Sequence, residues 1–167
     1  MRRTPPQAGD LLLEPVILLA MATLVVNDHV LKGVGPAPLT GILSGIAGLV
    51  LVPAVLVAGL ELLMSLRGRW MAPSMVPMLG ACLAVGTAYG AVELLPAATD
   101  IYRWTWGVLQ WPAATLLALA GGQAPPALVP VRAVADPFDL LALPVLAIPL
   151  VLQARRMSVP SGRFTTA

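Results

Sequence analysis

The fold is decided by the stretch Ile42–Leu63, which reads ILSGIAGLVLVPAVLVAGLELL and has Glu61 as its single charged residue. These 22 residues would form a helix about 33 Å long, enough to cross a hydrocarbon core of about 30 Å. A second stretch of the same length, Ser74–Leu95, has only Glu93 as a charged residue. Both stretches therefore predict membrane-spanning helices.

Two shorter apolar stretches, Leu11–Val26 and Phe138–Gln153, flank the long ones. Each needs its polar flanks at the membrane surface if it is to span. The whole chain is 58% hydrophobic and 11% charged, whereas a soluble domain has about 25% charged residues. We therefore predict an all-α membrane protein with a bundle of four transmembrane helices.

A fifth run, Trp104–Ala120, is ambiguous because Pro112 interrupts it and tryptophans crowd its first half. Trp prefers the boundary between membrane and water. With four spans and both termini in the cytoplasm, seven Lys and Arg residues lie inside and three outside, whereas a fifth span makes the two sides equal. Because positive charge is enriched on the cytoplasmic side, the sequence favours four spans with an interfacial or re-entrant helix at 104–120, with five spans as the alternative.

This topology divides the chain into a cytoplasmic leader at 1–10, a helical membrane domain at 11–154 and a cytoplasmic tail at 155–167. Arg2 and Arg3 before an apolar run are typical of a signal sequence, but Glu14 lies in that run, so we expect a retained signal anchor. We expect the bacterial inner membrane as the location. The net charge of +2 reflects arginines at helix ends, which argues against a nucleic-acid partner and for the lipid bilayer.

Small residues recur at four-residue spacing in both long stretches, which is typical of close helix packing in membranes. The positions are Gly41, Gly45 and Gly48 with Ser44 in the first stretch, and Gly86 and Gly90 in the second. The spacing does not say whether these faces pair within one chain or between chains.

Polar side chains gather at one depth if four helices span, on the extracytoplasmic side. The cluster consists of Asn27, Asp28, His29, Lys32, Thr40, Ser44, Glu93, Asp100, Arg103, Asp136 and Asp139. Three interpretations stay open: helix capping and solvation at the interface, a metal or acid–base site, and a binding surface for a partner or a lipid headgroup.

Capping is the simplest of the three. Asp136 and Asp139 resemble a helix start, Thr40 could cap the second helix, and Asp28 with Lys32 could form a helical ion pair. For the metal interpretation, Asp28, His29, Asp136 and Asp139 supply suitable oxygen and nitrogen ligands. Because these residues lack the spacing of a known metal-binding motif, we predict no cofactor.

Two acids, Glu14 and Glu61, fall near the cytoplasmic ends of the first and second helices. A charge inside the membrane is unfavourable unless it is paired, and long arginine side chains near helix ends can reach inward. We therefore expect structural pairing with Arg67 or Arg69 rather than a proton relay.

Three segments carry a resemblance to a group of small bacterial multi-pass membrane proteins without an assigned activity. They are Asn27–Lys32 (NDHVLK), Thr40–Leu49 (TGILSGIAGL) and Asp136–Pro144 (DPFDLLALP). The group's second segment commonly reads Thr-Gly-Lys-Leu-Ser-Asp, and this chain has Ile42 and Gly45 in place of the Lys and Asp. The resemblance implies a multi-pass topology over about residues 15–150, and the missing charges argue against a catalytic centre in that segment.

We therefore expect an accessory or scaffolding subunit, without catalytic activity, that packs against itself or a membrane-protein partner through its small-residue faces. The alternative is a membrane-embedded enzyme at the outer leaflet whose metal is held by the four candidate ligands. A small transporter is disfavoured because the polar groups lie at the ends of the spans rather than along a path through the membrane.

Overall fold

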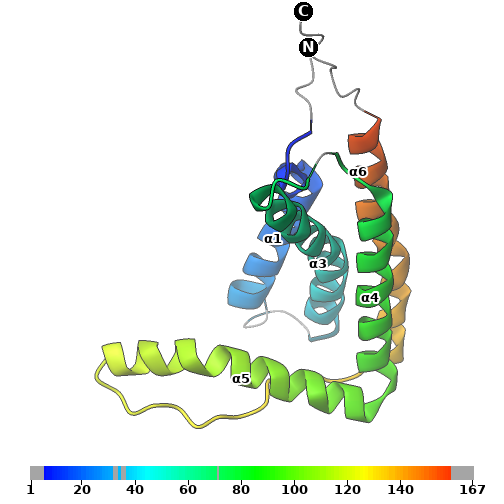
Figure 1. The fold of residues 1–167 in the computed structure, drawn as a ribbon. Coiled ribbons are helices and arrows are strands. Elements are labelled where there is room, and N and C mark those ends of the chain that lie inside the picture. Colours follow the sequence, from blue (N-terminus) through cyan, green and yellow to red (C-terminus); the bar gives the residue numbers. More distant parts are fainter. Residues whose placement is uncertain (1–5, 32–33, 35–36, 71, 159–167) are drawn as a thin grey trace, which may run out of the picture. The chain divides into compact units, whose positions relative to one another are not determined.

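The computed structural model describes residues 6–31, 34, 37–70 and 72–158, and this part of the chain is predominantly helical with no strand (Figure 1). Its elements in chain order are η1 (Asp10–Leu13), α1 (Pro15–Val26), the π-helical turn η2 (Asn27–Leu31), α3 (Ala37–Leu66), α4 (Met75–Leu94), α5 (Pro96–Ala120), the 3-10 segment η3 (Pro137–Leu146) and α6 (Ala147–Met157). The predicted all-α fold class is confirmed.

The chain divides into two compact units, each described below by itself. Unit 1 comprises Met1–Thr87 with Leu141–Ala167, and unit 2 comprises Ala88–Leu140. The division falls within α4 and within η3.

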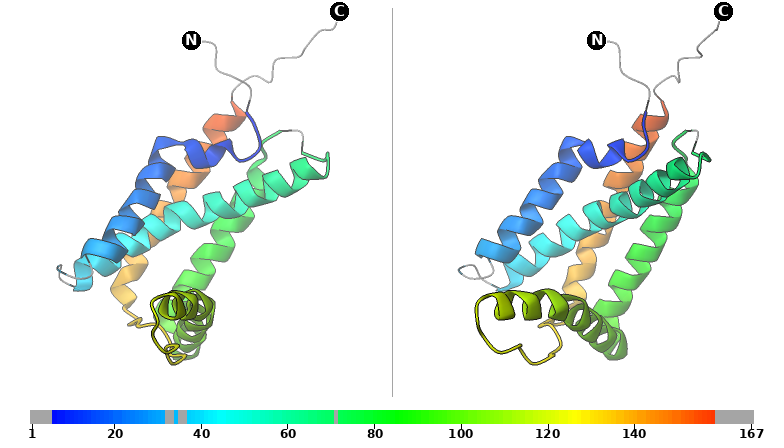
Figure 2. Two further views of the ribbon diagram at one scale, coloured as in Figure 1. Left: turned by 90° about the vertical axis from the view of Figure 1, so that its left-hand side faces the viewer. Right: turned by 60° about the vertical axis from the view of Figure 1, so that its left-hand side comes forward.

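In unit 1, α3 is the central helix, and it packs against α1 on one side and contacts α6 and η1 (Figure 2). Its buried apolar positions are Ala47, Val50, Ala54 and Val57, spaced three and four residues apart so that they form one stripe along the helix. The alanines let the neighbouring helix approach closely. The same spacing reaches Thr40 and Ser44 at one end of the stripe and Glu61 at the other.

The last part of the chain runs antiparallel to the first part of α4. Gln153 donates to the Ser74 carbonyl, while the Cys82 thiol lies 3.9 Å from the Leu146 carbonyl further along both helices. Cys82 is buried in the apolar core and serves as a small packing residue there. Pro144 and Pro149 have no N–H to donate, and the segment changes from 3-10 to α-helix between them.

Three helical segments are long and apolar enough to cross a membrane: Leu39–Leu66, Met75–Leu94 and Pro137–Met157. The predicted first span is shorter, because the chain turns at Gly9–Glu14 and the apolar helix runs only from Pro15 to Leu31. Its 17 residues extend about 26 Å, less than the hydrocarbon core of about 30 Å. Among the described residues, three of the four predicted spans therefore have a helix long and apolar enough to cross a membrane, and the prediction of four spans is not confirmed.

The helix α5 is not among these candidates, although its 25 residues make it longer than the second and third of them. It begins at Pro96, eight residues before the predicted run. Within unit 2, the chain after α5 runs back along it: Val131 exchanges backbone and side-chain hydrogen bonds with Arg103, and Trp111 Nε1 donates to the Pro126 carbonyl. We call the returning segment, residues 126–131, the strap. It packs closely on Gly107, since a Cβ added to Gly107 would come within 2.4 Å of the Val129 oxygen.

The predicted packing glycines fall into two groups. In α4, a Cβ on Gly86 would meet Leu146 at 2.9 Å, and one on Gly90 would meet Leu140 at 3.8 Å, so these glycines face the chain's own η3 segment. In α3, a Cβ on Gly41 or Gly48 would meet nothing within 4 Å among the described residues. Gly86 and Gly90 of α4 therefore serve contacts inside the chain, whereas Gly41 and Gly48 of α3 leave open space beside the described residues.

Candidate functional site

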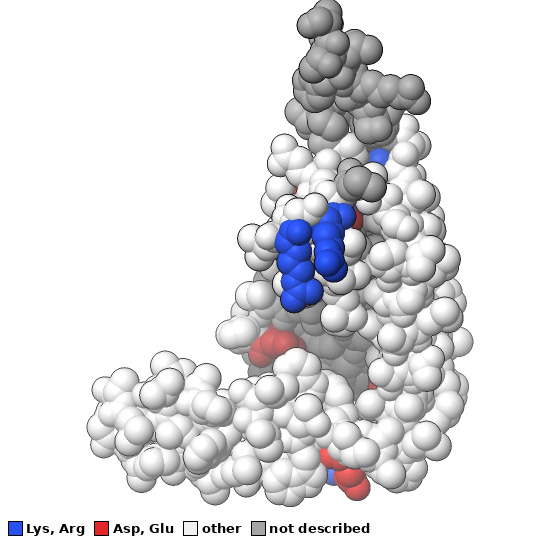
Figure 3. Space-filling model, in the orientation of Figure 1, with Lys and Arg blue, Asp and Glu red and all other residues white. Residues whose placement is uncertain are grey.

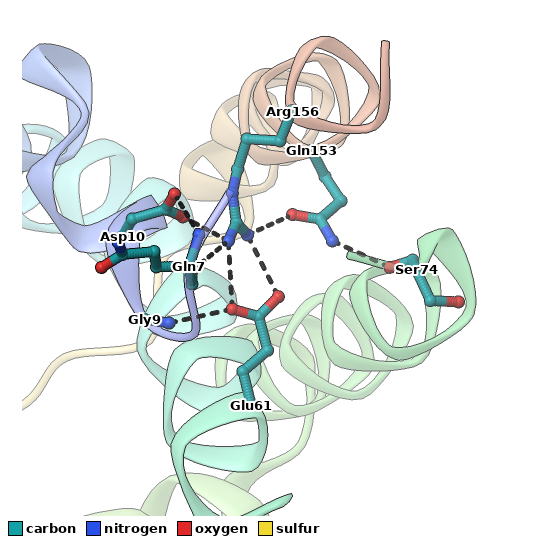
Figure 4. A network of polar contacts seen from close by, with 7 residues as sticks. All are labelled: Gln7, Gly9, Asp10, Glu61, Ser74, Gln153 and Arg156. Atoms are coloured by element: carbon teal, nitrogen blue, oxygen red, sulfur yellow. Dashed lines mark hydrogen bonds and ion pairs between the residues drawn. The ribbon is translucent and has the colours of Figure 1, made fainter. Parts of the chain in front are cut away.

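The most connected polar site of unit 1 is built around Arg156 (Figure 4). Its Nη1 donates to Glu61 Oε1 at 3.1 Å and to Gln153 Oε1 at 2.8 Å. Its Nη2 donates to Glu61 Oε2 at 3.1 Å and to the Gln7 carbonyl at 3.2 Å, and forms an ion pair with Asp10. We call this set the Arg156 network; its members are Gln7, Gly9, Asp10, Glu61, Ser74, Gln153 and Arg156.

Segments that are far apart in the sequence supply these groups. Arg156 and Gln153 lie three residues apart on α6, so they share one face of that helix, while Glu61 comes from the last part of α3. Gly9 donates its N–H to Glu61 Oε2 at 3.0 Å and has a φ of 82°. This left-handed conformation suits glycine, and a side chain there would also press on Leu62 at 3.2 Å.

The centre of the network is buried, and there the Arg156 guanidinium is paired with the Glu61 carboxylate. Arg156 is 6% exposed, Glu61 5% and Gln153 0%. A bidentate pair between a guanidinium and a carboxylate is the strongest geometry for such a contact, and here Gln153 and Gly9 provide further hydrogen bonds. The side-chain amide of Gln153 also donates to the Ser74 carbonyl at 2.9 Å, which ties α6 to the start of α4. The arrangement joins the chain's beginning and end to α3.

The sequence correctly predicted an arginine partner for Glu61, but it named the wrong one. Arg67 and Arg69 are exposed, and Arg156 makes the pair instead. The reason is that α6 continues to Met157, past residue 154 where we expected a cytoplasmic tail to follow. The sequence spacing within α6 could have indicated Arg156 as the partner of Glu61. The buried residues of this helix are spaced so that they form one face: Pro149, Leu152, Gln153 and Arg156.

Next to this network lies a pocket of about 370 Å³, between the end of α3 and the start of α4. Its walls are formed by Glu61 of the network, by apolar side chains and by the connecting residues. The lining residues are Leu60, Glu61, Met64, Arg69, Trp70, Ala72, Pro73, Ser74 and Pro77. No feature of the sequence had indicated this pocket.

Part of the predicted polar cluster lies in unit 1. Asn27 is fully buried, and its Nδ2 donates to the Thr40 carbonyl at 2.8 Å and to Ser44 Oγ at 2.7 Å. We call these three residues the Asn27 junction. Asn27 Oδ1 is buried and accepts no hydrogen bond from the described residues. Thr40 does not cap the helix as predicted, because α3 begins three residues earlier, at Ala37.

The neighbours of Asn27 have other surroundings. His29 is exposed, and its Nδ1 lies 3.0 Å from the Val25 carbonyl of the preceding turn. Asp28 is also exposed, and it has an interaction partner. Lys32, the predicted partner of Asp28, lies outside the described residues.

The other cluster residues belong to unit 2. Asp136 caps the start of η3 as predicted, since its Oδ1 accepts from the Phe138 N–H at 2.9 Å. Its own N–H donates to Glu93 Oε2 at 2.8 Å, and the Tyr89 hydroxyl donates to the Asp139 carbonyl at 3.2 Å. These contacts are structural, because each joins the end of α4 to the start of η3.

Asp100 and Arg103 form an ion pair at 3.3 Å across one turn of α5, with side chains 67% and 36% exposed. An exposed pair of this kind adds little stability. Arg103 also donates through Nε to the Val131 carbonyl at 3.2 Å, so it helps to hold the strap on α5.

The four candidate metal ligands do not come together as one group in the described residues. Throughout 6–31, 34, 37–70 and 72–158, no three His, Cys, Asp or Glu side chains are placed to hold a metal ion. Asp28 and His29 belong to unit 1, whereas Asp136 and Asp139 belong to unit 2.

Comparison with protein-family models, with curated proteins and with solved structures finds no match to this chain. The resemblance to small bacterial multi-pass membrane proteins therefore stays a prediction from the three segments that carry it.

Proposed function

We propose that the chain is a multi-pass integral membrane protein that acts as an accessory or scaffolding subunit and catalyses no reaction. One observation carries this proposal: two buried charges of unit 1, Arg156 and Glu61, pair with each other and join the chain's own segments. A catalytic centre needs a reactive group that is free to meet a substrate. The Arg156 network instead holds a helical scaffold together.

The surface of α3 supports the same proposal. Gly41 and Gly48 lie one turn on either side of Ser44 and leave open space where a side chain would stand. In a membrane, helices associate through such small-residue faces, because lipid provides no hydrophobic drive for pairing. We propose that this face contacts a membrane-protein partner or a second copy of the chain.

The proposed setting is the bacterial inner membrane with both termini in the cytoplasm. Three apolar helices support membrane insertion, and the excess of arginine near the chain ends supports the orientation. Under this proposal the lipid bilayer covers the many exposed apolar side chains of α3 and α4.

The test is purification in a mild detergent, with mass determination and metal analysis on one sample. We expect a particle heavier than one chain, containing either a stoichiometric companion or a second copy. Gly48→Leu should dissociate it by filling the open face, whereas Gly80→Leu should not. Gly80 is the matched control, because a side chain there would also meet nothing within 4 Å among the described residues, but it lies on α4 and not on the small-residue face of α3.

A single chain without companion would contradict the proposal, as would dissociation by both glycine variants alike. Bound metal that is lost in His29→Ala would instead support an enzyme at the outer leaflet.

A further inference from the structure

The pocket beside the Arg156 network has an imbalance between hydrogen-bond donors and acceptors. Arg69 lines it and is exposed; its backbone N–H donates to the Met64 carbonyl, but its guanidinium makes no hydrogen bond or ion pair with the described residues. Trp70 also lines it, and its Nε1 is buried without a hydrogen-bond partner among the described residues. Buried donors of this kind normally have an acceptor, so these two side chains leave hydrogen-bond donors unused beside the pocket.

Two of the acceptors that line the pocket, the Glu61 carboxylate and the Ser74 carbonyl, are already occupied. Both carboxylate oxygens of Glu61 accept from Arg156, and Oε2 also accepts from the Gly9 N–H. The Ser74 carbonyl accepts from Gln153. The negative charge of the Glu61 carboxylate is therefore compensated by Arg156. The unpaired donors of Arg69 and Trp70 favour a ligand that accepts hydrogen bonds and carries a negative charge.

The pocket's position narrows the choice of ligand. It lies between Leu66, where one candidate span ends, and Met75, where the next begins. If these helices span, this is the depth of the lipid headgroups, and basic pockets between helix ends are typical headgroup sites. Figure 3 shows basic side chains together on the face over this end of α3.

The shape and the apolar walls agree with a lipid. A volume of about 370 Å³ is at the small end of the range of about 300–1,000 Å³ for small-molecule sites, so it suits a headgroup rather than a whole lipid. Leu60, Met64 and Pro77 provide apolar wall beside the polar groups, against which the first part of an acyl chain can lie.

We propose that this pocket binds the phosphodiester headgroup of an anionic phospholipid, with Arg69 pairing with the phosphate and Trp70 Nε1 donating a hydrogen bond to it. The proposal rests on the membrane insertion proposed above, but not on an accessory role. Lipid bound here would cover the loop between α3 and α4 on the side of the Arg156 network.

The experiment is native mass spectrometry of the intact protein, exchanged into mixed micelles with either phosphatidylglycerol or phosphatidylcholine. We expect one phosphatidylglycerol per chain to be retained in preference to phosphatidylcholine. Arg69→Gln should weaken retention about tenfold or more, since it removes a hydrogen bond between charged groups. Trp70→Phe should weaken it about threefold while keeping the aromatic wall.

Arg155→Gln is the matched control, because Arg155 is an exposed arginine near a helix end that does not line the pocket. It should leave lipid retention unchanged. Equal losses in the Arg69 and Arg155 variants would overturn the proposal in favour of general charge attraction. Displacement of the lipid by an excess of inorganic phosphate, with phosphate itself retained, would overturn the lipid as the source of the anion.

The two proposals fail separately. A single chain without companion that still selects phosphatidylglycerol contradicts only the accessory role. A stable complex with no preference between the two lipids contradicts only the lipid site.

Discussion

The two ends of the buried face of α3 are both held by polar side chains, but with different chemistry. At one end the Asn27 amide donates to the Thr40 carbonyl and to Ser44 Oγ, all without a formal charge. At the other end the Glu61 carboxylate and the Arg156 guanidinium form a buried ion pair. The apolar stripe of α3 lies between these two junctions.

The Asn27 junction and the Arg156 network also join different segments of the chain. Asn27 contacts residues 13 and 17 positions away, so its junction fixes the pairing of neighbouring helices. Glu61 and Arg156 are 95 positions apart, and their network joins the start of the chain, α3 and α6. A neutral amide can be lost with a small loss of stability, whereas loss of one charge leaves the other buried and unpaired.

The largest effect is expected for Arg156→Leu. The substitution leaves Glu61 charged and 5% exposed, and it also removes the partner of Asp10. Breaking a buried pair in this way lowers the free energy of unfolding by about 3–5 kcal/mol. Thermal unfolding of the detergent-solubilised protein, followed by size-exclusion chromatography, measures the loss.

Two variants control this experiment. Arg155→Leu removes an exposed arginine from the adjacent position, so it should change stability little. The double variant Glu61→Leu with Arg156→Leu removes both charges and should recover much of the lost stability, because replacing a buried pair by apolar residues is often neutral. Equal destabilisation by the single and the double variant would show that packing, and not the unpaired charge, is responsible.

The two junctions were not equally predictable from the sequence. Asn27, Thr40 and Ser44 all belonged to the predicted cluster, because residues at the ends of successive helices in a hairpin are close in space whatever the rest of the fold does. The partner of Glu61 depends on how α6 packs, and only Arg67 and Arg69 were expected as partners from the sequence. The amphipathic spacing of 149, 152, 153 and 156 was readable, but an assumed boundary at 154 separated Arg156 from its helix.

A smaller effect is expected for Asn27→Ala. Asn27 is fully buried, and the variant leaves the Thr40 carbonyl and Ser44 Oγ without this donor. The expected loss in the free energy of unfolding is about 1–3 kcal/mol. The lower part of this range applies, because Asn27 Oδ1 is itself buried without a partner and its removal relieves that cost. The same unfolding assay should rank this variant between Arg156→Leu and Arg155→Leu; a loss as large as that of Arg156→Leu would contradict the comparison.

The number of spans shows where the sequence was insufficient. Hydropathy located the segments at 42–63, 74–95 and 138–153, which correspond to the three candidate spans. It also suggested a span at 11–26, but the helix there begins at Pro15 and extends to Leu31, and its 17 residues are too few to cross the hydrocarbon core without their polar flanks. Composition indicates where apolar residues are, but the length of a helix depends on where the backbone turns.

The smallest effect is expected for Ser44→Ala, which leaves the Asn27 bond to the Thr40 carbonyl in place. Loss of one neutral hydrogen bond lowers the free energy of unfolding by about 0.5–1.5 kcal/mol. If the Asn27 junction acts as a unit, the double variant Asn27→Ala with Ser44→Ala should lose less than the sum of the two single variants, because Ser44 has no amide to bond once Asn27 is gone. If the losses of the two single variants are instead strictly additive, Ser44 contributes to stability through α3 alone. The Asn27 junction would then consist of the single hydrogen bond from Asn27 to the Thr40 carbonyl.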